Sequence, residues 1–220
     1  ALAALFADQR FDVVCHQAAQ TSVTVSTREP IRDAQINVIG SLNLLEQCRE
    51  QRVGRFVFAS TGGAIYGEVP SGERADESCT PRPISPYACS KLAFESYLAA
   101  YRHEHGLTST VLRYANVYGP RQDPHGEAGV VAIFSQRLVA GESIQVNAMR
   151  EPGDDGCVRD YVYVRDVVRA NQLAVEGVLG DGVLNVGTGV ATSTRRLAEL
   201  IRAALGVSAD FHEADARELP

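Results

Sequence analysis

The sequence lacks the features that mark membrane, secreted and nucleic-acid-binding proteins. No apolar run approaches the ~18 residues that a bilayer-spanning helix needs. The first ten residues have neither the basic start nor the long apolar core of a signal peptide. The net charge of −6 argues against a nucleic-acid-binding surface. The five cysteines form no C-x-x-C pair, so we expect a reducing compartment, the cytoplasm, and no disulfide framework.

Two further absences concern how the chain is organised. The sequence contains no internal repeat and no low-complexity segment, and no Met opens it. It starts instead at Ala1, in what reads as the middle of a helix, which is a first indication of a fragment. What is present is typical of a soluble globular protein: 45% hydrophobic and 22% charged residues. A length of 220 residues allows one large or two small domains.

Predicted strands and helices alternate along the chain. Short, nearly continuous apolar runs, typical of strands buried on both faces of a parallel sheet, occur at 11–16, 55–59, 109–113 and 183–186. Apolar residues at helical spacing lie between them, at 30–52, 86–106 and 165–178. This alternation predicts an α/β fold with a parallel sheet covered on both faces. From about Gln122 the pattern loosens, and helices at 129–140 and 194–205 with a strand at 144–147 predict a smaller second lobe.

One short stretch carries the strongest chemical signal. Ser85 is a good N-cap and Pro86 suits a first helical turn, so Tyr87 should lie near the positive end of the helix dipole. Tyr87 and Lys91 are four residues apart and therefore share a helix face. A phenol titrates at about pH 10, and an ammonium group beside it would lower its pKa toward the range of a working base. The alternative is a surface Tyr and Lys on an ordinary helix.

Small and polar residues follow three of the predicted strands. They occupy Gln17–Thr21, Ser60–Gly63 and Tyr114–Asn116. In open parallel sheets, ligands bind beyond the carboxyl ends of the strands, so these segments are candidates for a binding site. Each also has a purely structural interpretation, such as close helix packing or the capping of a turn. Their occurrence together, with the helix of Tyr87 between two of them, favours a site.

These segments form part of an ordered series of motifs. The series is His16-Gln17-Ala18-Ala19, Ala59-Ser60-Thr61, Ile65-Tyr66-Gly67, Tyr87 with Lys91, Leu112–Arg121, Arg159-Asp160-Tyr161-Val162 and Asn185–Gly189. It covers essentially all 220 residues and resembles the extended short-chain dehydrogenase/reductases. Within them, the chain is most similar to the NAD-dependent epimerase/dehydratases that act on nucleotide-sugars, and above all to UDP-glucose 4-epimerases.

The resemblance implies an architecture and a cofactor. The expected fold is a Rossmann-like, doubly wound parallel sheet, incomplete at its N-terminal strands, with a smaller interleaved substrate lobe. The NAD-binding domain would comprise 1–121 and 164–190, and the substrate-binding lobe 122–163 and 191–220. NAD is the implied cofactor, and no metal is expected. In the complete protein, helices at 30–52 and 84–105 would pair into the four-helix bundle of a homodimer.

The resemblance also implies roles for single residues. Tyr87 would be the catalytic acid/base, Lys91 would hold the nicotinamide ribose, and Thr61 or Ser60 would hydrogen-bond the sugar O4. The implied cofactor-binding residues are Gln17, Ala18, Ala19, Thr21, Ser60, Tyr87, Lys91 and Ala115. The implied substrate-binding residues are Thr61, Asn116, Val130, Arg159 and Arg217. Arg159 would pair with the diphosphate, which a guanidinium binds through two hydrogen bonds. For the last position, Asp215 is an alternative to Arg217.

The activity implied by the resemblance is NAD-dependent epimerisation at C4 of a UDP-hexose, through a transient 4-keto sugar. A nucleotide-sugar 4,6-dehydratase or decarboxylase is an alternative, but those relatives carry an acidic residue where this chain has Gly62 and Gly63. A non-catalytic dinucleotide sensor is another. It would have no need for Tyr87, Lys91 and Thr61 together, and all three are present.

The chain departs from the family pattern at several places. No G-x-x-G-x-x-G turn precedes Phe11, although the family binds the pyrophosphate with such a turn. The C-terminal residues that wall the family's sugar pocket would lie beyond Pro220, and Tyr163 stands where many relatives have His. We therefore expect an internal fragment of a longer enzyme, truncated at both ends and inactive when isolated.

Overall fold

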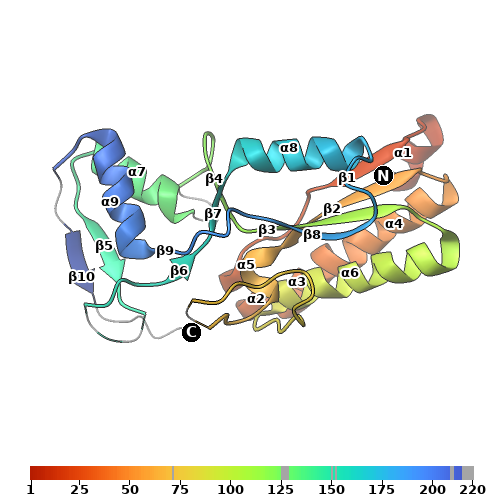
Figure 1. Ribbon diagram of the computed structural model, residues 1–220. Coiled ribbons are helices and arrows are strands. Elements are labelled where there is room, and N and C mark those ends of the chain that lie inside the picture. Colours follow the sequence, from red (N-terminus) through yellow and green to blue (C-terminus); the bar gives the residue numbers. More distant parts are fainter. Residues whose placement is uncertain (71, 125–128, 150, 152, 209–210, 215–220) are drawn as a thin grey trace. The chain divides into compact units, whose positions relative to one another are not determined.

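The computed structural model describes residues 1–220 except 71, 125–128, 150, 152, 209–210 and 215–220, and for 211–214 it describes the backbone alone (Figure 1). The chain divides into two units, each of which is described by itself. The first comprises residues 1–115 and 166–186, and the second comprises residues 116–165 and 187–220. Throughout the described ranges, every helix is too short or too polar to cross a membrane.

A four-stranded parallel sheet organises the first unit. Its strands follow the order β1 (Val13–His16), β2 (Arg55–Thr61), β3 (Ser109–Tyr114) and β8 (Gly182–Val186). Each strand lies within two residues of the range predicted from the sequence, and the Rossmann-like parallel sheet is confirmed. In the register, Tyr114 lies opposite Thr61 on one side and Val186 on the other. The carboxyl ends of β2, β3 and β8 therefore coincide.

Helices cover both faces of this sheet (Figure 1). They are α1 (Leu2–Asp8), α2 (Val23–Arg28), α3 (Pro30–Ala34), a π-helical segment η1 (Gln35–Gly40), α4 (Ser41–Glu50), α5 (Gly62–Ile65), α6 (Pro86–His105) and α8 (Val164–Val175). Successive β2 residues point to opposite faces, so Phe56 and Phe58 pack toward α4 and α6 while Val57 packs toward Ala174 of α8.

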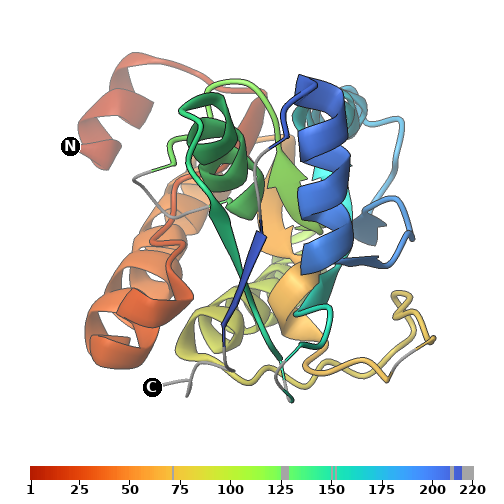
Figure 2. The same cartoon turned by 90° about the vertical axis from the view of Figure 1, so that its left-hand side faces the viewer.

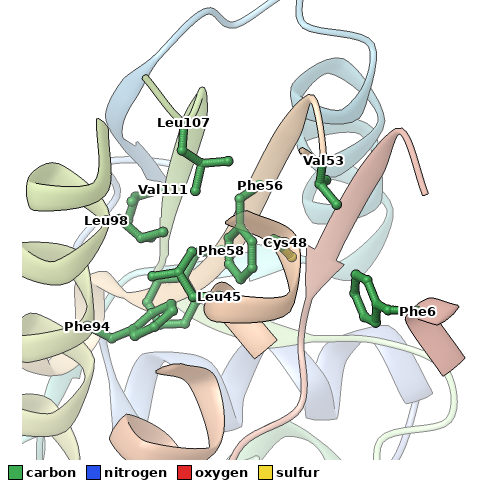
Figure 3. Close-up of a cluster of buried hydrophobic side chains, with 10 residues drawn as sticks. All are labelled: Phe6, Leu45, Cys48, Val53, Phe56, Phe58, Phe94, Leu98, Leu107 and Val111. Atoms are coloured by element: carbon green, nitrogen blue, oxygen red, sulfur yellow. The ribbon is translucent and has the colours of Figure 1, made fainter. Parts of the chain in front are cut away.

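The core beneath α4 and α6 is rich in phenylalanine (Figure 3). Phe94 of α6 packs on Phe58 of β2, with ring centroids 4.7 Å apart and the edge of one ring against the face of the other. Leu45 of α4 and Leu98 of α6 close the cluster. Burying one such side chain contributes about 1.5–3 kcal/mol relative to leaving it exposed. This core holds α6 against β2, and so fixes the residues of both elements relative to each other.

Local signals set both ends of α6. The Ser85 hydroxyl accepts a hydrogen bond from the Ala88 N–H at 3.2 Å, and Pro86 occupies the first turn. Gly106 ends the helix in a left-handed conformation, with φ of 68°. The capped helix predicted from the sequence is confirmed, with Tyr87 in its first turn.

The helical run predicted at 30–52 is real but not uniform. It consists of α3, η1 and α4, which follow one another from Pro30 to Glu50. At the junction, the Ser41 hydroxyl donates to the Asn37 carbonyl at 2.7 Å, a side-chain bond that competes with regular helix hydrogen bonding. Single π-turns inside helices occur frequently at functional sites.

In its described residues, the second unit consists of short strands and the helices α7 (Val130–Val139) and α9 (Thr194–Leu205). The strands β4 (Asn116–Tyr118) and β7 (Tyr161–Tyr163) pair in parallel, and β6 (Val158–Arg159) pairs antiparallel with β9 (Thr192–Ser193). Figure 2 shows α7 in green and α9 in blue beside the parallel pair β5 (Ile144–Asn147) and β10 (Phe211–Ala214). The core of this unit consists of Phe134, Leu138, Ile144, Val146 and Ala198.

Candidate active site

Lys91 and Tyr87 lie one turn apart on α6, as their spacing predicts. The Lys91 Nζ lies 5.9 Å from the centroid of the Tyr87 ring and 4.8 Å from that of the Phe58 ring. It donates a hydrogen bond of 2.9 Å to the carbonyl oxygen of Ala59 in β2. Lys91 is only 4% exposed, and it is the only lysine in the sequence. The interpretation of Lys91 as an ordinary surface residue is therefore wrong.

The surroundings of Lys91 act on its pKa in opposite directions. Burial lowers the pKa of Lys91 to about 8, and the carboxylates of Asp33 and Glu95 oppose that shift. Below that pH the ammonium form prevails, so at neutral pH a positive charge lies beside the half-buried Tyr87 ring. Burial and the charge of Lys91 lower the pKa of His16 to about 4, so His16 is neutral there. The ring of His16 bonds to the Ser41 hydroxyl at 2.8 Å.

The two hydroxyl residues at the carboxyl end of β2 differ in their partners. Ser60 donates a hydrogen bond of 2.5 Å to a carboxylate oxygen of Glu95, which also pairs with the Arg113 guanidinium at 2.6 Å. The Ser60 hydroxyl proton is thus directed into the core. Thr61 is the N-cap residue of α5, yet its side chain makes no capping hydrogen bond. Both residues are buried, with exposures of 4% and 8%.

The loop after β1 begins with two anchored glutamines around two alanines. The Gln17 amide donates to Asn171 Oδ1 at 2.9 Å and to the Tyr114 hydroxyl at 3.2 Å. Ala18 is exposed and Ala19 half-buried, and each carries only a methyl side chain. At the next residue, Gln20, the backbone is bonded to the side chain of Asn37 in η1.

Two more predicted cofactor-binding positions flank this region. Thr21 follows Gln20 and is exposed. Ala115 comes directly after β3, and its N–H donates to the Val186 carbonyl at 2.9 Å. The first unit thus places the loop at 17–21, the Ser60–Thr61 pair and Ala115 each at the carboxyl end of a strand of one parallel sheet, with α6 packed against β2.

The second unit contains the other predicted substrate residues. Asn116 starts β4, and both its N–H and its amide donate to the Asp160 carbonyl, at 2.9 and 3.3 Å. Arg159 is exposed in β6, next to Asp160 in sequence, and its guanidinium donates to the Val158 carbonyl at 2.8 Å. Val130 starts α7 and is half-buried. Arg217 and Asp215 lie outside the described residues.

Asp160 itself clamps a loop. Its carboxylate accepts hydrogen bonds from the Thr188 N–H at 2.9 Å, the Thr188 hydroxyl at 2.6 Å and the Gly189 N–H at 2.8 Å. Together with the Asn116 bonds, this makes Asp160 the centre that joins β4, β6 and the loop after β8. As for metals, the described ranges contain no group of three His, Cys, Asp or Glu side chains placed to hold one.

Reasoning from the sequence missed the supporting groups around Lys91 and Ser60. They are Asp33, Asn37, Glu95 and Arg113, all buried. One signal was available: Glu95 follows Lys91 by four residues, and Asn37 follows Asp33 by four, so each pair shares a helix face. Each of these faces turns out to be the buried one.

Comparison with known proteins identifies the family. The model of the NAD dependent epimerase/dehydratase family matches residues 1–187. The chain belongs to this family. It is 45% identical over 213 residues to the UDP-glucose 4-epimerase of Mycolicibacterium smegmatis, covering 96% of this chain and 66% of that protein.

Two solved structures are similar over nearly the whole chain. One is the UDP-glucose 4-epimerase of Thermus thermophilus in complex with NAD, with a TM-score of 0.91 and 53% identity over 98% of this chain and 69% of that one. The other is the UDP-glucose 4-epimerase of Thermotoga maritima with UDP-glucose, with a TM-score of 0.90 and 49% identity, over 99% and 68%. The chain spans 61% and 66% of the length of two curated relatives that it matches.

Proposed function

We propose that the complete protein carrying this chain is an NAD-dependent epimerase that inverts C4 of a UDP-hexose through a transient 4-keto sugar. The observation that carries the proposal is the Lys91–Tyr87 pair. Its ammonium is buried, fixed to the Ala59 carbonyl and placed next to the phenol at the start of a helix. The two epimerase structures, at 53% and 49% identity, support it. In this proposal the first unit holds NAD and the second holds the nucleotide-sugar.

The residues present fit NAD. The loop from Gln17 to Thr21 has only methyl side chains at Ala18 and Ala19, so a flat, extended ligand can approach the backbone there. Lys91 offers an ammonium whose hydrogen bond to Ala59 uses one of its three donors, which leaves donor capacity for ribose hydroxyls. When bound, NAD supplies reversible acceptance of a hydride from C4.

Tyr87 moves the proton. As a phenolate it accepts the proton of the C4 hydroxyl, and as a phenol it returns a proton after the sugar has turned over. The Lys91 charge favours the phenolate, because an opposite charge close to a titratable group stabilises its ionised form. The position of Tyr87 in the first turn of α6 adds the positive end of the helix dipole.

Of the two hydroxyl residues, we propose Thr61 as the one that bonds the sugar O4. The Ser60 proton is directed to the Glu95 carboxylate, and Glu95 is kept in place by its ion pair with Arg113. Thr61 makes no capping bond to α5, so its hydroxyl is not used by the local fold. Ser60 then serves the site by fixing the end of β2.

The same region disfavours a dehydratase. A side chain at Gly62 would place its Cβ 3.1 Å from the Arg113 carbonyl oxygen and 3.3 Å from that of Tyr114. An acidic residue at Gly62 would therefore require the backbone of β3 to give by a few tenths of an ångström. In the second unit, we assign the nucleotide-sugar to Asn116, Val130 and Arg159, with the exposed Arg159 guanidinium on the diphosphate. Arg217 is proposed as a further contact.

The decisive experiment uses the complete protein with UDP-glucose and with UDP-N-acetylglucosamine. We expect a product of unchanged mass that is epimeric at C4. Tyr87→Phe should lower kcat about 10²–10⁴-fold, the usual contribution of general acid–base catalysis, while bound NAD stays unchanged. Tyr97→Phe, an exposed tyrosine on the same helix, is the matched control and should match wild type. A product lighter by one water would establish a dehydratase, and Tyr87→Phe activity within a few-fold of wild type would refute the assignment of the base.

We further propose a homodimer in the cytoplasm. Large apolar side chains are exposed on the helices that would pair: Ile31 of α3 is 74% exposed, Ile39 of η1 53%, and Ile84, just before α6, 74%. Such exposed side chains mark interaction surfaces when they adjoin one another. All five cysteines are free, which supports a reducing compartment. Sedimentation analysis of the complete protein tests the dimer, and a monomer at micromolar concentration would refute it.

A further inference from the structure

Asp33 is a fully buried carboxylate that collects three side-chain donors. It lies in α3 with 0% exposure. Its Oδ1 accepts from the Gln20 amide at 2.7 Å and from the Asn37 amide at 3.0 Å, and its Oδ2 accepts from the Ser90 hydroxyl at 2.6 Å. The three donors come from the loop after β1, from η1 and from α6. One carboxylate thus joins three separate elements of the first unit.

The bond to Asn37 fixes more than one side chain. Because Asp33 can only accept, Asn37 must turn its NH₂ toward it, and the amide oxygen then points the other way. In that orientation Asn37 accepts from the Gln20 N–H at 2.9 Å and donates to the Gln20 carbonyl at 2.8 Å. Both polar groups of the Gln20 backbone are therefore held by a side chain whose orientation Asp33 sets. Gln20 directly follows the two alanines that we assign to the cofactor.

Stability alone does not account for a carboxylate at this place. Taking a charge out of water is expensive, and replacing buried charges with apolar groups of similar size is often neutral or stabilising. Inside the protein a purely structural link between the same helices needs no charge. What distinguishes this group is its position: it binds the loop after β1 and also Ser90, the residue that precedes Lys91.

We propose that Asp33 is a positioning residue for the cofactor: through Asn37 it sets the conformation of the loop at Gln17–Thr21 that receives NAD. This inference rests on the proposed function, because the loop is assigned to NAD there. Asp33 itself is buried; it acts through its hydrogen bonds to Asn37, Gln20 and Ser90, and its charge also supports the ammonium form of Lys91. The expected consequence is that the loss of the acceptor at Asp33 weakens NAD binding although Asp33 itself does not touch the cofactor, and Asp33→Asn, which also lacks the charge, separates this effect from the charge's effect on Lys91.

Two substitutions at Asp33 separate positioning from general destabilisation. Asp33→Leu is of similar size but accepts no hydrogen bond, so Gln20, Asn37 and Ser90 lose their partner. Asp33→Asn keeps one carbonyl oxygen for Gln20 and Asn37, and its NH₂ can donate to the Ser90 hydroxyl. The matched control is Thr110→Val, which removes a buried hydroxyl that donates to the Gly180 carbonyl at 2.6 Å near the opposite end of β3.

The measurements are NAD titration of the cofactor-free protein and amide hydrogen exchange at Gln20. For Asp33→Leu we expect NAD binding weaker by about tenfold and exchange at Gln20 faster by about tenfold, because the loop loses its buried anchor. Asp33→Asn should recover both values to within about threefold of wild type, since it restores the acceptor. Thr110→Val should change neither, even where it lowers the stability of the protein.

The outcomes decide the proposal. Asp33→Leu with wild-type NAD affinity and wild-type exchange at Gln20 would overturn it, and so would equal losses in Thr110→Val. If Asp33→Leu does not fold, Asn37→Ala takes its place, because it removes the link between Asp33 and the Gln20 backbone; unchanged values there would overturn the proposal as well. The exchange measurement needs no turnover. A protein that fails to epimerise would therefore refute the proposed function and leave the test of Asp33 intact.

Discussion

Two buried carboxylates of the first unit and two half-buried carboxylates of the second bind different kinds of partner. In the first, Asp33 and Glu95 are buried and bind side chains: Gln20, Asn37 and Ser90 on one, Ser60 and Arg113 on the other. In the second, Asp154 and Asp160 are half-buried and bind backbone N–H groups of their loops. The first arrangement fixes particular functional side chains. The second shapes a loop mainly through its backbone, with the Thr188 hydroxyl as a side-chain partner of Asp160.

This difference predicts where the molecule tolerates change. Buried charged networks act as a unit, so the loss of one member leaves its partner without compensation in a water-free surrounding. Half-buried clamps stay partly hydrated, so water replaces a lost partner at lower cost. Damage in the first unit should therefore appear as lost stability or lost cofactor. Damage in the second should appear as weaker binding of the nucleotide-sugar.

The largest expected effect is at Glu95. Glu95→Ala leaves the Arg113 guanidinium, which is 5% exposed, without its charge partner, and breaking such a buried pair costs about 3–5 kcal/mol in the free energy of unfolding. Urea denaturation measures this loss. Glu199→Ala, in the exposed pair with Arg196, is the control and should change the free energy by less than about 0.5 kcal/mol. Equal losses in the free energy of unfolding for the two substitutions would contradict the distinction between buried and exposed carboxylates.

A smaller effect is expected at Asp160. Asp160→Ala removes the acceptor for the Thr188 and Gly189 N–H groups, so the loop next to Arg159 loses its shape. We expect KM for UDP-glucose to rise about tenfold with the affinity for NAD unchanged. Steady-state kinetics and NAD titration on the same variant test this. A variant that lost NAD and kept its KM would show that the second unit serves the cofactor, contrary to the proposal.

The last comparison concerns pH. The pKa of Lys91 is about 8 in the folded protein, against an ordinary value of 10.5. Between these values the unfolded chain binds more protons than the folded one, so the free energy of unfolding rises with pH from about 8 to 10.5. The turnover rate should instead fall as pH rises through about 8, because Tyr87 then loses its charged neighbour. Lys91→Met should abolish this contribution to the stability slope, and urea denaturation at a series of pH values measures it.

The elements that local signals determine were predictable from the sequence. The ends of α6 follow from Ser85, Pro86 and Gly106, and α9 lies where the sequence predicts it, at 194–205. The prediction missed α2, α5 and the short strands β4, β6, β9 and β10, because two to six residues carry too little periodicity to stand out. The π-turn in η1 was also missed; the side chains of Asn37 and of the adjacent Ser41 bond to Gln20 and His16, which lie 17 and 25 residues away in the sequence.

For the site, the sequence spacing identified the pair Tyr87 and Lys91, whereas the burial of Lys91 and Asp33 could be learned only from the structure. Tyr87 and Lys91 share a face because they are four residues apart, which any sequence reading shows. That Lys91 is buried and bonded to Ala59 follows only from the packing of α6 on β2, and that Asp33 is buried follows from the packing of α3 on α6. A carboxylate in a helical run reads as solvent-exposed unless its partners, here 13 and 57 residues away, are known.

Lys91 has one more consequence, for chemistry directed at amines. The other twenty basic residues among the 21 are arginines, so within these 220 residues the only side-chain amine is hidden in the core. Amine-specific reagents, and enzymes that modify lysine, can therefore reach a lysine side chain of this stretch only when the packing around Lys91 opens. The rate at which Lys91 becomes acylated therefore measures how often this packing opens. Bound cofactor should lower that rate.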